Sequence, residues 1–284
     1  MGEFSRFVIC GSEIVDASIV PERYMGSPGQ CPSGVYDTLL VRGERDGAVL
    51  VNWTEHWARF CGACRAQLRI DPPVQGEQLV RKLVDLCALS VGEYMRCRLS
   101  LFLDPMELSD SGGLCHFLVQ VRGVSTGLYS TDFSCTMGRH RRVGDDNTYR
   151  YKLMGRGYVD EELAIAKEAG RQDVIFLNDL NEVCEGSYSN FWLIRGGVLV
   201  TPRLDAPCLP GIVRGNVLSW AQGAGVVVRE SAVTLHDVES AEAIFLTSSI
   251  RGVQLVTGID GVGRIWNTEN LPGYWSDLVK SVQP

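Results

Sequence analysis

The chain has 284 residues, of which 45% are hydrophobic, 21% charged and 8% aromatic, so fibrous and intrinsically disordered classes are excluded. Its 27 basic and 34 acidic residues give a formal net charge of −7 with no long block of one sign. This charge argues against nucleic acid and anionic membranes as partners. At about 100–200 residues per domain, the length predicts one large domain or two modest ones.

The N-terminus and the cysteines predict a soluble, cytoplasmic protein. The segment MGEFSRFVICGSEIVD carries charges inside what would be the apolar stretch of a secretory signal, and no segment approaches 18 uninterrupted apolar residues. Ten cysteines are scattered through apolar runs, as reduced core cysteines are. Cys61 and Cys64 have the spacing of a metal or redox motif, but no second pair of ligands is spaced for zinc, so we predict no metal site.

The first part of the chain passes from strand-like to helical patterns and back. Five segments alternate apolar and polar residues as strands do, and they are 6–10, 35–41, 48–52, 94–103 and 114–121. The second and third of these are predicted to form a hairpin around a turn between Gly43 and Gly47. Two segments have apolar residues at three- and four-residue steps and are predicted helices, namely 53–68 and 75–89.

The second part is predicted to start near residue 125 and to mix short strands with helices. Its polar stretch 139–150 is predicted to be a loop. Helices are predicted at 158–168, 212–222 and 237–241. Strands are predicted at 174–177, 183–184, 190–194, 198–201, 226–229 and 243–247. The pattern predicts an α+β fold with an N-terminal unit, 1–124, and a C-terminal unit, 125–284.

Two segments of the second part have the chemistry to bind an anion. In Leu209-Pro-Gly-Ile-Val-Arg214 a turn leads into a helix, and the first amides of a helix bind phosphate through unpaired N–H groups and the helix dipole. The predicted strand Phe245-Leu-Thr-Ser-Ser249 ends in three hydroxyls, which are possible phosphate donors. Each signal alone is weak, because most helices begin without a ligand and such hydroxyls are more often N-caps.

Two charged residues stand where packing does not explain them. Glu185 ends a short predicted strand, and its ordinary interpretation would be a solvated carboxylate. Lys152 lies among the apolar and aromatic residues of Tyr149-Arg-Tyr-Lys-Leu-Met154, an environment that does not suit a solvent-exposed lysine. A lysine and a glutamate in such positions are candidates for a functional site.

Taken together and in this order, the motifs resemble those of the class IV, or fold-type IV, pyridoxal-phosphate enzymes. That group includes branched-chain and D-amino-acid aminotransferases and aminodeoxychorismate lyase. The resemblance extends over nearly the whole chain and rests on Gly34-Val-Tyr-Asp-Thr-Leu39, Glu55-His-Trp-Ala-Arg59, Glu185-Gly-Ser-Tyr-Ser-Asn190, Thr201-Pro-Arg-Leu-Asp205 and Leu209-Pro-Gly-Ile-Val-Arg214. It implies a small N-terminal α/β domain, a larger C-terminal α/β domain built as a pseudo-barrel, and a homodimer.

The resemblance also implies pyridoxal 5'-phosphate (PLP) as the cofactor. Lys152 would form the Schiff-base link to it and afterwards move the proton of the substrate's α-carbon. Glu185 would contact the pyridine nitrogen and keep it protonated, so that the ring accepts electrons from the reacting carbon. Four residues would bind the phosphate, namely Arg59, Ile212, Val213 and Ser249.

Several of these residues have a second interpretation that the sequence leaves open. Without the resemblance, Arg59 would be a surface arginine on an amphipathic helix. Arg203 and Arg214 are candidates for phosphate contacts, although structural salt bridges are the more ordinary explanation. Tyr158 is near enough in sequence to Lys152 to reach the phenolic oxygen of PLP, or it is a core residue.

Three segments favour the lyase branch of the family. They are Lys152-Leu-Met-Gly-Arg156, Thr247-Ser-Ser-Ile-Arg-Gly252 and Arg122-Gly-Val-Ser-Thr-Gly-Leu-Tyr-Ser130. The last departs from the lyase pattern, because Gly127 replaces an arginine that would bind a carboxylate and Leu128 replaces a glycine. The substrate is therefore less defined by the sequence than the cofactor.

The predicted reaction is conversion of 4-amino-4-deoxychorismate to p-aminobenzoate and pyruvate by an aminodeoxychorismate lyase-like enzyme. Thr38 would protonate the leaving enolpyruvyl carbon, although a structural strand threonine is equally consistent with its position. The alternative is an aminotransferase of the branched-chain or D-amino-acid type that acts on a small amino substrate with a 2-oxo acid acceptor. A third possibility, a cofactor-binding protein with little catalysis, is disfavoured by the presence of both Lys152 and Glu185.

Overall fold

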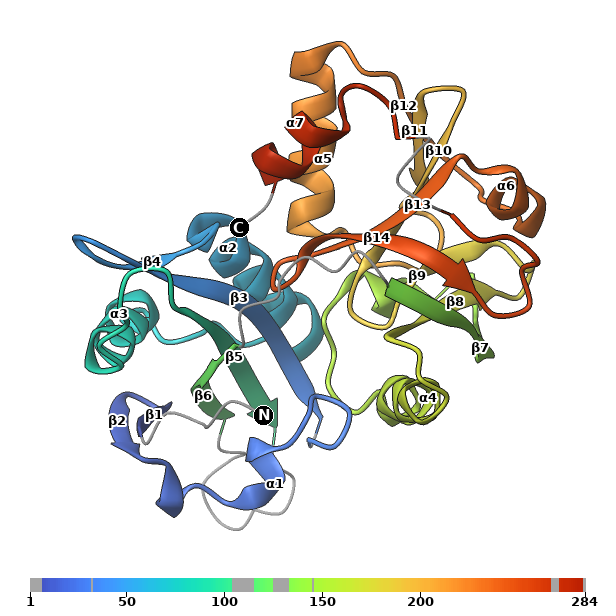
Figure 1. The fold of residues 1–284 in the computed structure, drawn as a ribbon. Helices are drawn as coiled ribbons and strands as arrows, with labels where there is room; N and C mark the ends of the chain where they lie inside the picture. Colours follow the sequence, from blue (N-terminus) through green and yellow to red (C-terminus); the bar gives the residue numbers. More distant parts are fainter. Residues whose placement is uncertain are drawn as a thin grey trace. The chain divides into compact units, whose positions relative to one another are not determined.

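The computed structural model describes residues 7–31, 33–103, 115–124, 133–144, 146–266 and 271–282. The chain forms two compact units: unit 1 is Met1–Thr126 with Tyr151–Gly157, and unit 2 is Gly127–Arg150 with Tyr158–Pro284 (Figure 1). The division into domains 1–124 and 125–284 stays a prediction. The observed units differ from it because the chain returns to unit 1 at residue 151, so Lys152 belongs to unit 1.

Unit 1 is built on a six-stranded antiparallel sheet in the order β2-β1-β6-β5-β3-β4. Its strands are β1 (Phe7–Cys10), β2 (Glu13–Asp16), β3 (Gly34–Glu44), β4 (Gly47–Leu50), β5 (Tyr94–Leu103) and β6 (Cys115–Gly123). The predicted hairpin is confirmed as β3–β4, which turns between Glu44 and Gly47.

Three α-helices accompany this sheet, and they are α1 (Glu22–Met25), α2 (Trp53–Ala63) and α3 (Gly76–Leu86). The predicted helix 53–68 is continuous, but its last turn, Cys64–Leu68, widens into a π-helix. Arg69 then adopts a left-handed conformation with φ of 59°, which ends the helical segment. The predicted helix 75–89 is shorter than expected because Ala88 has φ of 49°.

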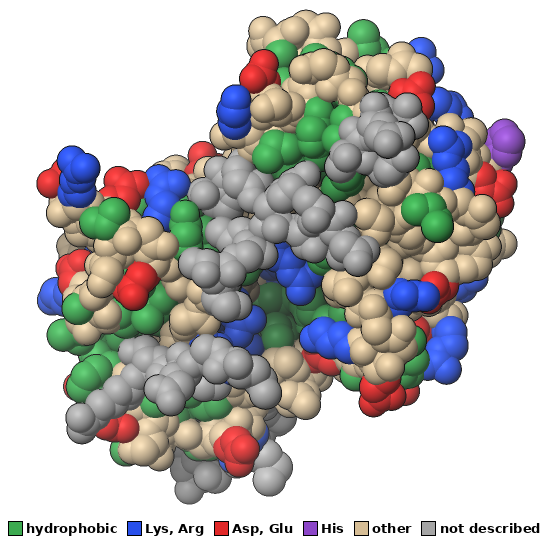
Figure 2. Space-filling view, in the orientation of Figure 1, with side chains coloured by type: hydrophobic (Ala, Val, Ile, Leu, Met, Phe, Trp, Pro, Cys, Tyr) green, Lys and Arg blue, Asp and Glu red, His purple; other side chains and the backbone are tan. Residues whose placement is uncertain are grey.

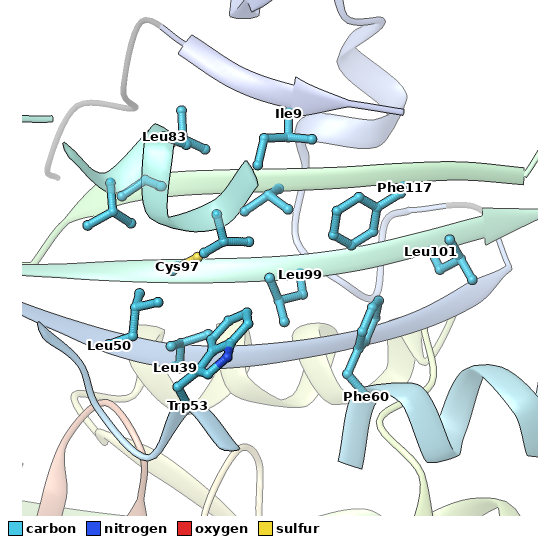
Figure 3. Packing of buried hydrophobic residues seen from close by; sticks show 14 of the residues in the cluster. Ile9, Leu39, Leu50, Trp53, Phe60, Leu83, Cys97, Leu99, Leu101 and Phe117 are labelled. Carbon is cyan, nitrogen blue, oxygen red and sulfur yellow. The ribbon is translucent and has the colours of Figure 1, made fainter. Parts of the chain in front are cut away.

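The two faces of the unit 1 sheet have different partners. Odd-numbered residues of the central strands, including Leu39, Leu99 and Phe117, pack against α2 and α3 (Figure 3). Even-numbered residues, including Tyr36 and Phe102, pack with Tyr24 of α1. Full burial of a Leu or Phe side chain contributes roughly 1.5–3 kcal/mol. Because side chains alternate along a strand, the odd-numbered Asp37 of β3 points into the α2 side of the sheet.

Unit 2 contains an eight-stranded sheet in the order β12-β11-β10-β13-β14-β7-β8-β9. An additional pairing of β9 with β10 closes six of these strands into a barrel, which confirms the predicted pseudo-barrel. The strands are β7 (Phe133–Arg142), β8 (Asp173–Asn178), β9 (Val183–Gly186), β10 (Asn190–Arg195), β11 (Val198–Pro202), β12 (Val228–Ser231), β13 (Ala243–Ser248) and β14 (Gly252–Ile259).

The helices of the second half are α4 (Gly157–Glu168), α5 (Ile212–Ala224), α6 (Leu235–Ser240) and α7 (Trp275–Val282). Helices α5 and α7 lie side by side and pack on Trp192 and Phe245, which face out of the barrel (Figure 1). Phe191 and Leu246, the neighbours of those residues along β10 and β13, point the other way into the barrel core. Helix α5 ends at Gly225, whose φ of 68° closes the last turn.

Several segments differ from the sequence prediction. The predicted loop 139–150 is wrong at its start, because β7 continues to Arg142 and pairs in parallel with β8 after an irregularity between Met137 and Arg141. The strand predicted at 226–229 lies at Val228–Ser231. Strand β14 and helix α7 were not predicted at all. The end of β7 was predicted as a loop because its composition is polar. Three exposed residues precede its buried last residue, Arg142.

The face drawn in Figure 2 carries mixed charges. On the face drawn in Figure 2, Lys and Arg side chains are interspersed with Asp and Glu side chains. A binding surface for a nucleic-acid backbone would instead need a stripe of positive charge. Among the described helices, none is both long and apolar enough to cross a membrane.

Candidate active site

Lys152 lies on a short segment that extends the edge of the unit 1 sheet. Its carbonyl accepts a 2.9 Å hydrogen bond from the Tyr36 amide, and the Met154 amide donates at 2.9 Å to the Gly34 carbonyl. A side chain at Gly34 would collide with the Leu101 carbonyl, so this close packing of strands needs glycine. The backbone is therefore fixed on both sides of Lys152.

The Lys152 amine shares a face with two side chains of β3. Its Nζ atom lies 5.0 Å from the centre of the Tyr36 ring. Thr38, two residues along the strand, points to the same face as Tyr36. The Thr38 hydroxyl has no hydrogen-bond partner among the described residues, and the side chain is only half-buried. Lys152 is half-buried too, whereas the other lysines of the chain, Lys82, Lys167 and Lys280, are exposed.

The opposite face of β3 carries a buried charged cluster of Asp37, His56 and Arg59. Arg59 donates from Nε to Oδ2 of Asp37 and from Nη2 to Oδ1, both at 2.8 Å. His56 Nδ1 lies 2.8 Å from the same Oδ1. Asp37 and His56 are fully buried, and only 15% of the Arg59 side chain is exposed. Arg59 is therefore not a solvated surface residue.

The charge states of this cluster follow from its contacts. Burial alone would raise the pKa of Asp37, but Arg59 and His56 outweigh burial and hold this pKa well below its usual range. Burial lowers the pKa of His56, and the pull of Asp37 in the other direction only partly compensates. His56 is thus neutral and donates its Nδ1 proton to the ionised Asp37. Its Nε2 atom is buried and has no partner among the described residues.

This cluster makes stability depend on pH in a defined direction. The unfolded chain binds a proton on His56 below about 6.5, the ordinary pKa, while the folded chain binds it only at lower pH. The His56 contribution is therefore complete above pH 6.5 and is lost as pH falls through the lowered pKa of the folded state. Asp37 stays ionised throughout this window because its own pKa is far below the usual range.

We expect the free energy of unfolding to fall below pH 6.5 by at most about 1.4 kcal/mol per pH unit through this histidine. In His56→Asn, which retains an N–H donor near Asp37, this part of the pH dependence should disappear. Urea unfolding at pH 7.5, 6.5 and 5.5 measures both proteins. An unchanged difference between pH 7.5 and pH 5.5 in the variant would contradict the assignment of a neutral buried His56.

In unit 2, Glu185 is a buried carboxylate rather than a solvated strand end. It is 7% exposed, and its Oε1 atom accepts a hydrogen bond from Nη1 of Arg142 on β7. Its Oε2 atom accepts from the Leu209 amide at 2.9 Å. The Arg142 guanidinium also lies over the Phe176 ring, with 4.7 Å to the ring centre. Burial opposes the charge of Arg142, but Glu185 outweighs it and raises the pKa of the guanidinium.

The motif Glu185 to Asn190 connects this carboxylate to the start of α5. Asn190 Nδ2 donates to the Leu209 carbonyl at 2.8 Å and lies 3.4 Å from Oε2 of Glu185. A side chain at Gly211 would collide with the Asn190 side chain, which explains the glycine before the helix. Asp173 holds the loop between the two motif ends by accepting from the Ser187 amide at 3.0 Å. The loop thereby fixes Glu185 and the helix start as one assembly.

The N-terminus of α5 has amides available to an anion. Gly211 is the N-cap and provides no side-chain hydrogen bond, so the amides of Ile212 and Val213 have neither a capping partner nor an acceptor within the helix. Arg214, in contrast, is buried and donates to the Pro202 carbonyl and to Glu230. It is a structural arginine, as is Arg203, which pairs with Asp205 at 2.7 Å.

The three hydroxyls after Phe245 have different partners. Thr247 Oγ1 accepts from Trp192 Nε1 at 3.1 Å, and Ser248 Oγ accepts from the Arg251 amide at 3.2 Å. Ser249 has no hydrogen-bond partner among the residues that the structure describes. Thr247 pairs with Asn190 across β13 and β10, so Ser249 extends beyond that pair at the same end of the sheet as the Asn190 motif.

Tyr158 provides a test of whether the residues fit a cofactor with a phenolic oxygen. Its hydroxyl is buried and has no partner within the described part of the chain, while its ring stacks on His140 with centres 4.1 Å apart. A buried hydroxyl without a partner is unfavourable unless a ligand supplies an acceptor. Together with the Glu185 carboxylate and the α5 amides, this donor gives unit 2 one group for each polar edge of PLP, so the residues fit the cofactor.

Several features of this arrangement were absent from the sequence prediction. Arg142, Asp37 and His56 were not predicted, although the last two lie in segments that carry the family resemblance. Arg142 had no signal, since its segment was interpreted as a loop. The segment with Gly127 and Leu128, which was compared with the lyase pattern in the sequence, lies outside the described residues.

Comparison with known proteins identifies the family. Residues 34–259 match the family model for class IV amino-transferases. A Thermotoga maritima protein provisionally named a branched-chain-amino-acid aminotransferase is 39% identical over 114 residues, which cover 40% of this chain and 41% of that protein. The matched segment therefore spans less than half the length of this curated relative.

Solved structures of other proteins share the fold of this chain, and two of them are compared with it. One is an aminotransferase from Brucella abortus bound to PLP, with a TM-score of 0.75, 22% identity and coverage of 92% of this chain and 93% of that chain. The other is a Legionella pneumophila protein provisionally assigned as a 4-amino-4-deoxychorismate lyase, with a TM-score of 0.73, 24% identity and coverage of 87% and 89%. The fold thus serves both activities and does not discriminate between them. The chain belongs to the class IV aminotransferase family of PLP-dependent enzymes.

Proposed function

We propose that Lys152 forms the covalent link to PLP and that Glu185 faces its ring nitrogen. The observation that carries this proposal is the connection that Asn190 makes between Glu185 and the first residues of α5. A carboxylate for the ring nitrogen and amides for the phosphate are thereby held by one loop. Tyr158, with its buried hydroxyl, is suited to the phenolic oxygen of the same cofactor.

The phosphate is proposed to bind Arg59, the amides of Ile212 and Val213, and Ser249. These donors combine a guanidinium, a helix N-terminus and a hydroxyl, which suit a phosphate dianion. The guanidinium and the helix N-terminus would provide local positive charge for the phosphate in a chain whose net charge is −7.

In the proposed chemistry, bound PLP supplies an electron-accepting ring for the negative charge that develops at the substrate's α-carbon. In its neutral form, Lys152 would accept the substrate's α-proton on Nζ. It would afterwards donate this proton to a different atom of the reacting molecule. The amine lies 5.0 Å from the centre of the Tyr36 ring, on the face of β3 that also carries Thr38. Glu185 would accept a hydrogen bond from the protonated ring nitrogen, and Arg142 compensates the charge of the carboxylate.

We propose amino-group transfer between an amino acid and a 2-oxo acid as the reaction. The support is the curated relative, which is named a branched-chain-amino-acid aminotransferase and shares 39% identity in its matched segment. The sequence alone favoured the lyase and gave the aminotransferase as the alternative, so this proposal reverses their order. The lyase is the second candidate, and it is supported by the Thr38 hydroxyl, a proton donor on the same face of β3 as Tyr36.

A substrate assay separates the two reactions. With a branched-chain amino acid as donor, we expect product only when a 2-oxo acid is present, with ping-pong kinetics because both substrates use one pocket in turn. Thr38→Val should leave this transfer within about threefold of the wild-type rate. Release of p-aminobenzoate and pyruvate from 4-amino-4-deoxychorismate without any 2-oxo acid, abolished in Thr38→Val, would instead establish the lyase.

We also propose a cytoplasmic homodimer, on the family resemblance alone. The net charge of −7 and the mixed charges of the surface in Figure 2 are compatible with a small-molecule enzyme of this kind. Its expected partners are an amino substrate and a second copy of the chain.

A further inference from the structure

We propose that His140 is a positioning residue that holds the Tyr158 ring and thereby directs its hydroxyl at the phenolic oxygen of the cofactor. The motif comparison assigns no role to His140, which lies in the polar end of β7. The inference rests on the proposed function, because it concerns how one of the proposed cofactor contacts is held. It makes recognition of the phenolic oxygen depend on a histidine that does not itself touch the cofactor.

The first argument is the location of the Tyr158 hydroxyl. The Tyr158 ring packs on Phe176 of β8, with ring centres 5.8 Å apart and planes at 85°. Phe176 pairs directly with Glu185 across β8 and β9, and the Arg142 guanidinium lies over the same Phe176 ring. The Tyr158 hydroxyl is buried and has no hydrogen-bond partner among the residues with a described position. Tyr158 therefore belongs to the side-chain cluster of the Arg142–Glu185 pair, where its hydroxyl is left for a ligand.

The second argument is that two rings hold Tyr158 from different directions. The His140 ring lies nearly parallel to it, with centres 4.1 Å apart and 25° between the planes. The Phe176 ring lies nearly perpendicular to it. Together these contacts oppose rotation of the phenol. A side chain that is already ordered loses little conformational freedom when it bonds a ligand, so the stack should strengthen the hydrogen bond to the phenolic oxygen.

The third argument is that the backbone of His140 is itself fixed. Strand β7 becomes irregular after Met137, and the amides of Arg139 and His140 in this irregular part donate to Oε1 of Glu162 at 3.0 and 2.9 Å. Glu162 follows Tyr158 by four residues on α4, so both side chains lie on one face of that helix. One face of α4 thus holds the backbone of His140 and contacts its ring.

The fourth argument is that burial does not explain an aromatic ring at this position. The side chain of His140 is exposed, as are those of Arg139 and Arg141 beside it. Its imidazole makes no hydrogen bond or ion pair with any residue in the described parts of the chain. The stack on Tyr158 is therefore the contact that accounts for the ring.

A purely structural role for His140, such as docking α4 on β7, makes a different prediction. It would change stability and would affect PLP and an analogue that lacks the 3-hydroxyl group equally. A positioning role changes the preference for PLP over this 3-deoxy analogue. The ratio of the two dissociation constants, measured by absorbance titration of the protein freed of cofactor, therefore separates the two roles without any assay of turnover.

For Tyr158→Phe we expect this preference to fall on the order of 10- to 100-fold, because a hydrogen bond to a charged oxygen is lost. For His140→Ala we expect a fall of about 2- to 10-fold, because the released phenol must be ordered when the cofactor binds. His140→Phe retains a ring for the stack and should stay within about twofold of the wild type. Arg139→Ala is the matched control, since it removes an exposed side chain beside His140 and should keep the wild-type preference.

A double variant tests whether the effect passes through Tyr158. In a Tyr158→Phe background, adding His140→Ala should lower the preference no further. An additional loss of similar size in that background would overturn the inference, as would a wild-type preference in His140→Ala or an equal loss in His140→Phe. If Tyr158→Phe itself keeps the wild-type preference, the proposed contact of Tyr158 with the cofactor is wrong and the inference is wrong with it.

Discussion

Lys152→Ala should lose the covalent link to PLP and lower turnover by about 10³-fold or more, the range typical of removing a group that transfers the substrate proton. Backbone hydrogen bonds tie Lys152 and Met154 to β3. The side chain of Lys152 therefore starts from a fixed position on the face of β3 that carries Tyr36 and Thr38. No other lysine of the chain is partly buried in this way, since Lys82, Lys167 and Lys280 are all exposed.

Lys167→Ala is the matched control, because it removes an exposed lysine from α4 without touching the proposed site. Its visible absorption band and its turnover should equal those of the wild-type protein. Stopped assays with the preferred amino donor measure the rates, and spectra at matched protein concentration measure the band. A Lys152→Ala protein with more than about a tenth of the wild-type turnover would contradict the catalytic role.

Glu185→Ala should destabilise the protein by about 3–5 kcal/mol, because it leaves the buried Arg142 without its charge partner. Only 2% of the Arg142 side chain and 10% of the Glu185 side chain are exposed, so solvent cannot replace the lost partner. The alanine variant is therefore a poor test of catalysis. Glu185→Gln keeps the volume and an acceptor for Arg142, and it should fold while losing about 10²-fold in turnover.

Asp260→Asn is the comparison for the stability part of this prediction. Asp260 pairs with Arg171 at 2.7 Å, but 37% of Arg171 and 42% of Asp260 side-chain surface is exposed. Loss of such a surface pair should cost no more than about 1 kcal/mol. Urea unfolding of both variants gives the two free energies. Equal losses in Glu185→Ala and Asp260→Asn would show that Arg142 does not depend on Glu185.

The elements with strong periodicity were predictable from the sequence. Strand β3 is a mostly apolar run that is buried on both faces, and α2 repeats its apolar residues at helical spacing, so both were predicted near their observed limits. Glu185 and the start of α5 were found through their motifs, and the structure adds the reason for those motifs. Asn190 bonds to Glu185 and Leu209, and Gly211 provides the space that Asn190 needs.

Features that depend on contacts distant in the chain were not predictable. Arg142 ends a run of polar residues, and contacts with distant residues such as Glu185, 43 residues away, explain a buried strand end there. Asp37 belongs to a strand whose alternation is visible, but its ion pair with Arg59 requires the packing of α2 on β3. Lys152 was placed in the C-terminal part by sequence order, whereas the pairing of its segment with β3 puts it in unit 1.

The central claim is that Lys152 is the residue that binds PLP covalently, and the chain is well suited to a direct test because it has only four lysines. Wild-type protein loaded with PLP, reduced with borohydride and digested, can be mapped by peptide mass spectrometry. We predict the reduced cofactor on the peptide that contains Lys152 and on none that contains Lys82, Lys167 or Lys280. Labelling of one of those three lysines instead, or an unlabelled Lys152 peptide, would contradict the account.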